Sequence, residues 1–379
     1  MERHPLACIL PPHMVEQIVA NGTPEQRAKA IQTAQVSAEL RAQRREMAEV
    51  ERPPSFEVPA AAPVLQRRVY SAGNRSGLPG QLVRGEGAPP TNDPAADEAY
   101  DGAGATYNLY WEVYQRNSIN DAGMPIDSTV HYQVGYDNAF WNGMQMVYGD
   151  GDEDLPADQR LFNRFTISLD IIGHELAHGV TQYTGNLAYV SQPGALNESF
   201  SDVFGSLVRQ RTLHQDAAAA DWIIGAGLFT ANVRGVGIRS MKEPGTAYND
   251  PVLGKDPQPA HMRDYVNTPQ DNGGVHINSG IPNHAFYLTA VEIGGFAWEK
   301  AGRIWYATLC NTIRANSNFQ DAANLTYRAA SDLFGKGSLE QQAVAHGWNG
   351  VGITVEDVDT PPDTRPGCLA GVMKLLGLR

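Results

Sequence analysis

The sequence predicts an α+β protein in which a short helical segment, a β-rich unit and a mainly helical unit follow one another. Residues 22–53 are rich in Ala, Gln, Glu and Arg, which favour helices. Residues 67–164 are rich in Gly and Asp and contain short aromatic and β-branched runs such as STVHYQVGY, a pattern typical of irregular β-structure. Helical periodicity begins at Ile167. The 379 residues leave room for two or three such units, at about 150 residues per domain.

The first fifty residues are expected to form a separate helical unit, called here the leader (residues 1–50). A short helix is predicted over residues 14–20. A second, longer helix should follow Thr23, whose side chain and that of Gln26 form a capping box, with a proline at the first helical position. It can run to about residue 49, because two consecutive prolines soon follow.

Shifts in composition set the remaining boundaries. Residues 51–66 contain four prolines and are expected to form an extended linker that proteases can cut. Residues 67–185 form the predicted β-rich lobe, which ends in a helix, and residues 186–353 the predicted helical lobe. Amphipathic helices are predicted over residues 197–210, 283–292 and 299–314. Residues 354–379 are a Pro-rich tail, which we expect to be loosely attached rather than a docking segment.

Composition and charge exclude several classes of protein. The formal net charge of −13 argues against a nucleic-acid partner. Three scattered cysteines, Cys8, Cys310 and Cys368, are too few for a disulfide framework and fit a reducing compartment. The start lacks the apolar run of a secretory signal, and no stretch reaches about 18 uncharged apolar residues. We therefore expect no membrane partner and a protein that is cytoplasmic or is secreted without a signal peptide.

The most informative stretch is DIIGHELAHGVTQYTG. His174 and His178 stand four residues apart and project from one face of a helix, so two imidazoles can share one cation. Glu198, on the following helix, is a candidate third ligand. Two histidines, one glutamate and an open fourth position form a catalytic zinc site. The competing interpretation is a helix with two ordinary surface histidines, which the presence of Glu198 disfavours.

Two further acids suit this chemistry. Zinc lowers the pKa of its bound water to about 7, and a nearby carboxylate must take the proton and pass it to the leaving amine. Glu175, adjacent to a ligand, is placed for that role. Asp202, one turn beyond Glu198, could accept the free N–H of His174 and fix its tautomer, although it could also be a simple surface acid.

Four motifs in a fixed order resemble the thermolysin family of metallopeptidases. These are HELAH from His174, GALNESFSD around Glu198, DNAFWNGMQMVYGDGD from Asp137 and DNGGVHINSG from Asp271. The resemblance covers about residues 67–353. The short leader with Cys-x-x-Pro-Pro resembles the protealysin-like subgroup, which has a short N-terminal propeptide.

The resemblance implies a two-lobed zincin fold, with a β-rich N-terminal lobe, a central zinc-binding helix, a helical C-terminal lobe and substrate in the cleft between the lobes. It implies that His276 and Tyr189 hold the oxyanion while Asp271 orients His276. It further implies that Arg239 binds a substrate carbonyl. Asn138 and Ala139 would pair with the substrate main chain as with an added strand. Taken alone, most of these residues would be structural.

An apolar wall is implied for the pocket that receives the residue after the scissile bond. The residues matched to it are Phe162, Phe165, Ile171 and Ile238. Such a pocket favours bulky hydrophobic side chains, although Phe and Ile are more commonly plain core residues.

The sequence departs from the family pattern at the double calcium site. Arg209 stands where a glutamate ligand is expected, and a guanidinium cannot ligate a cation. Calcium binding there is therefore doubtful, and an ion pair between Asp170 and Arg209 could replace it. The acidic run of residues 150–154 lacks the spacing of a calcium loop and is expected to be a solvated turn.

These observations predict a zinc-dependent neutral endopeptidase, made as a self-inhibited precursor, that cleaves proteins or peptides on the amino side of bulky hydrophobic residues. Its own propeptide should occupy the cleft. Cys8 could bind the zinc directly, or Pro11, Pro12 and their neighbours could simply fill the cleft. The alternatives are an interaction protein with a permanently blocked cleft, and an exopeptidase, for which no motif that captures an amino terminus is visible.

Overall fold

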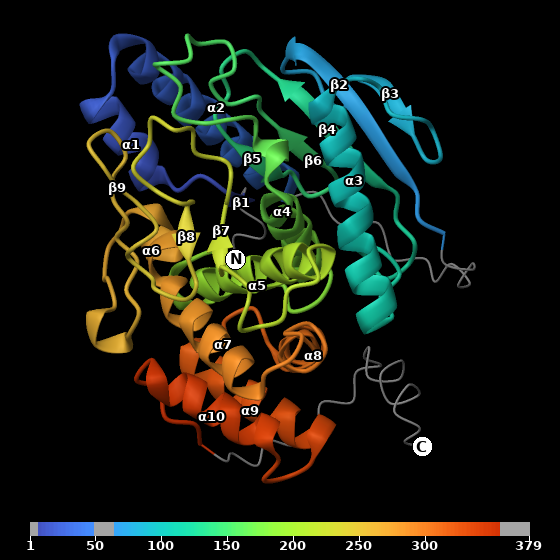
Figure 1. Cartoon of the computed structure of the whole chain (residues 1–379), viewed down its shortest axis with the longest axis vertical. Coiled ribbons are helices and arrows are strands. Elements are labelled where there is room, and N and C mark those ends of the chain that lie inside the picture. Colours follow the sequence, from blue (N-terminus) through green and yellow to red (C-terminus); the bar gives the residue numbers. More distant parts are fainter. Residues whose placement is uncertain (1–6, 49–63, 357–379) are drawn as a thin grey trace.

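A computed structural model describes residues 7–48 and 64–356 of the chain (Figure 1). Most of the predicted linker, residues 51–66, and nearly all of the predicted tail, residues 354–379, lie outside the described residues. No described helix combines the length and the apolar character that are needed to cross a membrane.

The described part of the leader consists of a short strand followed by two helices. These are β1 (Ala7–Cys8), α1 (Pro12–Asn21) and α2 (Pro24–Ala48). The predicted capping box is present, since Thr23 N donates to Gln26 Oε1 at 2.8 Å and Gln26 N donates to Thr23 Oγ1 at 3.3 Å. Local sequence signals therefore define where α2 starts.

One mixed sheet of six strands forms the core of the β-rich lobe, and the leader supplies one of its edges. Its strands are β1, β2 (Arg67–Arg75), β3 (Gln81–Gly85), β4 (Ile126–Tyr132), β5 (Ala139–Trp141) and β6 (Met146–Tyr148). The order is β1-β5-β6-β4-β2-β3, with β4 parallel to both β2 and β6 and the other pairs antiparallel. Because β1 belongs to the leader, β5 would be an edge strand without it.

A long helix within this lobe, α3 (Pro94–Asn108), was not predicted from the sequence. Its start follows known rules, because Asp93 caps it and a proline occupies the first turn. Two interior glycines lower its helix propensity. Gly102 is required by packing, since a Cβ there would lie 2.4 Å from Ile172 Cδ1. A π-helical turn, Leu109–Val113, continues α3.

The second half of the chain is mainly helical, as predicted. A 3₁₀ turn (Phe165–Ile167) leads into α4 (Leu169–Gln182), α5 (Ser191–Thr212), α6 (Asp271–Asn278), α7 (Gly280–Ile293), α8 (Ala301–Ala307), α9 (Phe319–Phe334) and α10 (Leu339–Gly350). Short two-residue strands are β7 (Ile223–Ile224), β8 (Arg239–Ser240), β9 (Asn249–Asp250) and β10 (Gly254–Lys255), and a 3₁₀ turn (Met262–Asp264) follows them. The predicted helices over residues 197–210 and 283–292 lie within α5 and α7. The predicted helix over 299–314 is instead divided into α8 and a π-helical turn, Thr308–Thr312.

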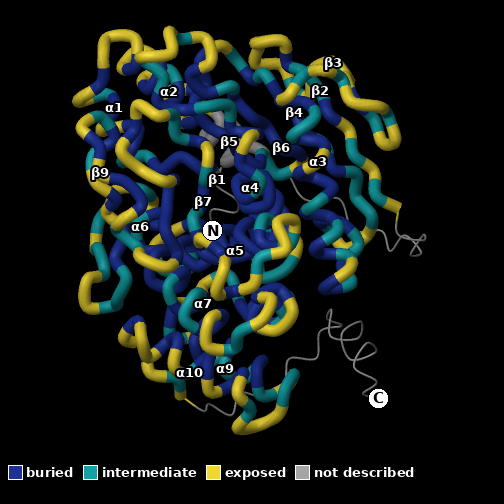
Figure 2. Tube along the Cα trace, viewed as in Figure 1, coloured by how far each residue is buried: buried dark blue, intermediate teal, exposed yellow. Residues whose placement is uncertain are grey.

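Helices α4 and α5 lie at the centre of the molecule, between the sheet and helices α7 to α10 (Figure 1). Figure 2 shows both helices largely buried. Where they cross, a Cβ on Gly205 would lie 2.4 Å from the Asp170 carbonyl oxygen, and a Cβ on Gly173 would lie 3.0 Å from Gly205 Cα. The two glycines therefore allow the close approach that brings the functional residues of α4 and α5 together.

Candidate functional site

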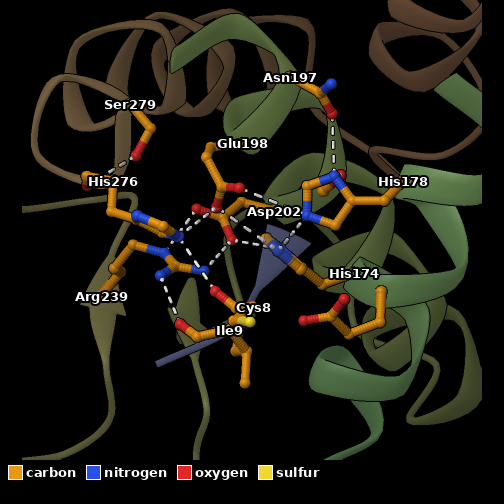
Figure 3. Close-up of polar contacts among 12 residues, drawn as sticks. Cys8, Ile9, His174, His178, Asn197, Glu198, Asp202, Arg239, His276 and Ser279 are labelled. Carbon is orange, nitrogen blue, oxygen red and sulfur yellow. Dashed lines mark hydrogen bonds and ion pairs between the residues drawn. The ribbon is translucent and has the colours of Figure 1, made fainter. Parts of the chain in front are cut away.

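Three side chains from the central helices form a compact metal-binding group. His174 and His178 come from α4 and Glu198 from α5, and all three are buried. One ligand atom of each lies within 4.8 Å of the others, and no other group of His, Cys, Asp and Glu in the described part of the chain does this. The two Nε2 atoms are 2.9 Å apart, and the Glu198 carboxylate lies 3.4 to 3.6 Å from them (Figure 3).

Neighbouring groups on α5 fix the orientation of both imidazoles. His174 Nδ1 lies 2.8 Å from Asp202 Oδ1, the contact expected from the sequence. His178 Nδ1 lies 2.9 Å from Asn197 Oδ1 and 3.0 Å from Ser201 Oγ. The contacts of Asn197 and Ser201 with His178 were not predicted from the sequence, although both residues lie near Glu198 in the same motif. These contacts direct each Nε2 toward Glu198.

The donor set fits a metal ion. Glu198 Oε2 is buried and has no hydrogen-bond partner, which is costly unless something else binds it. Burial lowers the pKa of His178 to about 3 and so keeps its imidazole neutral, the form that binds metals. Two imidazole nitrogens and one carboxylate are typical ligands of zinc.

Glu175 lies next to His174 on α4 and is fully buried. Its Oε2 accepts a hydrogen bond of 3.0 Å from the backbone N–H of Trp141, whereas its Oε1 has no hydrogen-bond partner. Burial, reinforced by the charge of Glu198, raises the pKa of Glu175 well above its ordinary value. The carboxylate therefore has the raised proton affinity of a general base.

The opposite side of the site carries hydrogen-bond donors. His276, on α6, is held by Asp271, which lies 2.6 Å from its Nδ1 and accepts its backbone N–H at 2.8 Å. Burial alone would lower the pKa of His276, but the charges of Asp271 and Glu198 raise it to about 9. The Tyr189 hydroxyl donates to Glu198 and lies 3.2 Å from His276 Nε2.

Arg239 forms a two-pronged ion pair with Asp202. Its Nη2 and Nε lie 2.7 and 2.8 Å from the two carboxylate oxygens, and Asn283 also donates to Asp202 at 2.8 Å. Burial alone would raise the pKa of Asp202, but Arg239 and His174 hold it below its ordinary value. Asp202 thus links a metal-binding histidine to the arginine expected to bind substrate.

The leader crosses this site in an extended conformation (Figure 3). His276 Nε2 lies 3.0 Å from the Cys8 carbonyl oxygen. Ile9 N donates to the Ala139 carbonyl at 3.1 Å, Arg239 Nη1 donates to the Ile9 carbonyl at 3.3 Å, and Leu10 N donates to Asn138 Oδ1 at 2.9 Å. The residues that the resemblance assigned to substrate therefore bind the leader backbone.

The side chain of Cys8 points away from the metal-binding group. It packs in a small hydrophobic cluster with Tyr136, Phe140 and Val147, and its backbone carbonyl faces His276 instead. Cys8 does not belong to the group of close ligand atoms among the described residues. This packing favours the alternative in which the leader fills the cleft without ligating the metal.

The four residues assigned to the specificity pocket are all buried, and they belong to the same hydrophobic cluster as the leader residue Ile9. They are Phe162, Phe165, Ile171 and Ile238. The rings of Phe162 and Phe165 have centroids 6.0 Å apart. Their role in specificity stays a prediction.

Arg209 occupies the position of a ligand in the expected double calcium site. Its guanidinium lies 3.7 Å from Asp170 and forms a closer ion pair of 2.7 Å with Asp221. Residues 151–154 form the predicted turn, and Glu153 and Asp154 are exposed, but the prediction that the acidic run is solvated is wrong for Asp152. Asp152 is 1% exposed and contacts Lys29 of the leader, which neutralises it.

Comparisons with known proteins agree with this geometry. The family profile described as "Thermolysin metallopeptidase, catalytic domain" matches residues 64–182, and "Thermolysin metallopeptidase, alpha-helical domain" matches residues 185–353. An "Extracellular metalloprotease" of Pectobacterium carotovorum subsp. carotovorum is 48% identical over 94% of this chain and 99% of its own length. "Protease PrtS" of Photorhabdus sp. (strain Az29) is 52% identical over 78% of each chain.

A solved structure has a similar fold over most of the chain. It is described as "Precursor of Protealysin, Metalloproteinase from Serratia proteamaculans", and it aligns with a TM-score of 0.81 and 46% identity over 92% of this chain and 100% of its own. The two profiles together cover most of the chain, and they fall on the lobes that carry the metal-binding group. The chain therefore belongs to the thermolysin family of metallopeptidases and is protealysin-like.

Proposed function

We propose that the chain is a zinc-dependent endopeptidase made as a self-inhibited precursor, and that it hydrolyses peptide bonds on the amino side of bulky hydrophobic residues. The observation that carries the proposal is the position of the leader. Its backbone binds Ala139, Asn138, Arg239 and His276 as an added strand would, directly beside the metal-binding group.

The catalytic roles are assigned to groups that face this backbone. His174, His178 and Glu198 would hold the zinc, which when bound acts as a Lewis acid and activates water at neutral pH. Glu175 takes the proton of the attacking water and delivers it to the leaving amine. Its raised pKa supports the first of these transfers, the uptake of the proton.

The donors opposite Glu175 stabilise charge on the substrate. His276 and Tyr189 donate hydrogen bonds to the oxygen of the scissile carbonyl as it becomes negative. Asp271 holds His276 in place, and the raised pKa of His276 keeps its Nε2 protonated. Arg239, fixed by Asp202, holds the next carbonyl, as it does that of Ile9 in the leader.

Latency follows from the same contacts. In the precursor the Cys8 carbonyl occupies the position of the scissile carbonyl, and Ile9 occupies that of the residue after it. Leader residues also line a partly open cavity of about 180 Å³ beside His276 and Tyr189, so the leader covers part of the cleft that its strand does not fill. Removal of the leader would open the cleft and expose β5 for substrate pairing.

The relatives named above include an extracellular metalloprotease, and this supports export of the chain. We propose that it acts outside the cell on protein or peptide substrates.

Zinc content and hydrolysis of casein together test the proposal. We expect one zinc per chain by elemental analysis, and hydrolysis that appears when the leader is removed. An interaction protein that merely keeps this fold would not hydrolyse casein with the leader removed, and an exopeptidase would release single residues. Either result would refute the proposal.

A further inference from the structure

Lys29, on α2 of the leader, inserts its ammonium group into an acidic pocket of the β-rich lobe that contains none of the residues assigned to metal binding or catalysis. Its Nζ lies 3.0 Å from the Gly151 carbonyl oxygen and 3.0 Å from Asp152 Oδ1. It also lies 2.5 Å from Asp154 Oδ1 and 3.8 Å from Asp137 Oδ1. Four oxygen atoms thus surround one buried cation, and Figure 1 shows α2 beside the green segments that supply them.

The pocket is built into the fold and is not a surface ion pair. The orientation of the Asp152 carboxylate is fixed, because its Oδ2 accepts hydrogen bonds from the backbone N–H groups of Leu161 at 2.7 Å and Phe162 at 3.0 Å. The side chain of Asp137 is only 8% exposed, and its Oδ1, which faces the ammonium, has no hydrogen-bond partner. Burial and the charge of Asp152 raise the pKa of Asp137 and the Lys29 ammonium lowers it, so a cation at this position favours the ionised carboxylate.

The Lys29 ammonium is the charge that balances this pocket. Burial alone would lower the pKa of Lys29, but Asp137, Asp152 and Asp154 raise it above its ordinary value, so it stays charged. The arginines of the neighbouring loop bind elsewhere, Arg160 to the carbonyls of Leu155 and Glu153 and Arg164 to the carboxylates of Glu98 and Glu153. Loss of the leader would therefore leave three facing carboxylates without this cation.

We propose that the pocket of Asp137, Gly151, Asp152 and Asp154 is a binding site for a hard divalent cation, with calcium as its ligand, and that Lys29 occupies this site in the precursor. The proposal rests on the precursor role proposed above. It concerns residues other than those of the double calcium site that Arg209 disrupts.

The chemistry of the pocket matches calcium. Calcium prefers carboxylate and carbonyl oxygens, accepts irregular geometry and completes its coordination with water. Calcium–oxygen distances of about 2.3 to 2.6 Å require the oxygens to close in once the ammonium has left. The side chain of Asp154 is 44% exposed and can make this movement, whereas Asp152 is fixed. A partly open site of this kind should have a dissociation constant on the order of 10⁻⁴ to 10⁻³ M.

The proposal couples calcium to latency. Calcium and the docked leader would compete for the same oxygens, so each must weaken the binding of the other by the same factor. Calcium would therefore favour release of the leader.

Calorimetric titration of calcium into the full-length, zinc-loaded chain tests the site without requiring peptidase activity. The unmodified chain should bind little calcium. Lys29→Met, which removes the ammonium and keeps most of the stem, should gain one site. Arg27→Met is the matched control, because Arg27 lies on the same helix, is exposed and donates to the Gly22 carbonyl, and it should gain none.

Two double variants assign the ligands. Lys29→Met with Asp154→Asn should bind calcium at least tenfold more weakly than Lys29→Met alone. Lys29→Met with Asp158→Asn, which changes an exposed acid of the same loop, should bind as Lys29→Met does. A folded Lys29→Met chain that binds no more calcium than the unmodified chain would overturn the proposal, whether or not the enzyme proves to be a peptidase.

Hydrogen–deuterium exchange on the chain without substitution gives an independent test should Lys29→Met not fold. We expect 10 mM calcium to speed the exchange of the α2 amides severalfold, and Asp154→Asn to reduce this effect. Exchange of α2 that does not respond to calcium would also overturn the proposal.

Discussion

The carbonyl oxygen of Cys8 accepts a hydrogen bond from His276 Nε2 at 3.0 Å, and this contact places a peptide group of the leader in the catalytic site. It comes from a strand that pairs antiparallel with β5, with Cys8 opposite Phe140 and Ala7 opposite Trp141. On the function proposed above, inhibition by the leader would use the same contacts as substrate binding.

Glu198→Gln should abolish tight zinc binding. The substitution replaces the one charged ligand by a neutral amide, which binds zinc poorly. We expect the zinc content to fall from about one per chain to a small fraction and peptidase activity to fall roughly 100-fold or more. Glu292→Gln, which changes a glutamate paired with an exposed histidine, should leave both unchanged. Unaltered zinc and activity in Glu198→Gln would show that the third ligand is misassigned.

Digestion of a peptide library should show cleavage before Leu, Ile or Phe. The residues assigned to the pocket are apolar, and none carries a charge that could pair with Lys or Asp. Ile238→Ala should shift the preference toward Phe by enlarging the pocket. A preference for a charged residue after the scissile bond would contradict the pocket assignment.

Calcium should not stabilise the precursor strongly through the Arg209 position. Arg209 places a guanidinium 2.7 Å from Asp221 and 3.7 Å from Asp170, and its positive charge would repel calcium ions at this position. Thermal unfolding should be compared with and without calcium in Asp154→Asn, so that the Lys29 pocket does not contribute. A rise of more than about 10 °C in the midpoint would reveal a strong site that the sequence did not predict.

Docking of the leader should weaken as the pH falls below about 6.5. Burial lowers the pKa of His13 to about 4, and its Nε2 lies 3.0 Å from the Tyr248 hydroxyl. Because the docked state disfavours protonation of His13, this side chain contributes its full free energy to docking only above the pKa that it has in the undocked leader. The contribution declines progressively as the pH falls to about 4. The equilibrium constant for docking of the leader should fall roughly tenfold or more. His13→Gln should reduce this dependence.

Nuclear magnetic resonance of histidine-labelled protein checks the cause directly. His13 should remain neutral down to about pH 5 in the precursor. Titration of His13 near its ordinary value of about 6.5 would rule out this contribution to docking.

How far the sequence predicted the structure depends on the range of the interactions. The helix spacing of His174 and His178 and the capping box of Thr23 are local, and both were visible in the sequence. Helix α3 was missed because Gly102 lowers its intrinsic propensity, and only packing against Ile172 explains that glycine.

Contacts between distant segments left little trace in the sequence. The pairing of β1 with β5 joins residues more than a hundred positions apart, and strands of two and three residues carry no periodicity. The same applies to Lys29 and Asp152, since an acidic run beside a surface turn looks like a solvated feature until its partner is known. The one indication in the sequence was that the predicted leader helix carries charged residues, which can pair with the acidic run of residues 150–154.

The central claim is that the chain is a peptidase held inactive by its own leader, and the most direct test is mass spectrometry of purified protein during incubation. We predict that the unmodified chain loses roughly its first fifty residues and that peptidase activity rises in parallel. Glu175→Ala, which keeps the metal ligands and removes the general base, should stay full length, whereas Glu299→Ala should process normally. Processing of Glu175→Ala at the normal rate, in preparations free of other proteases, or full activity of the intact precursor would contradict the account.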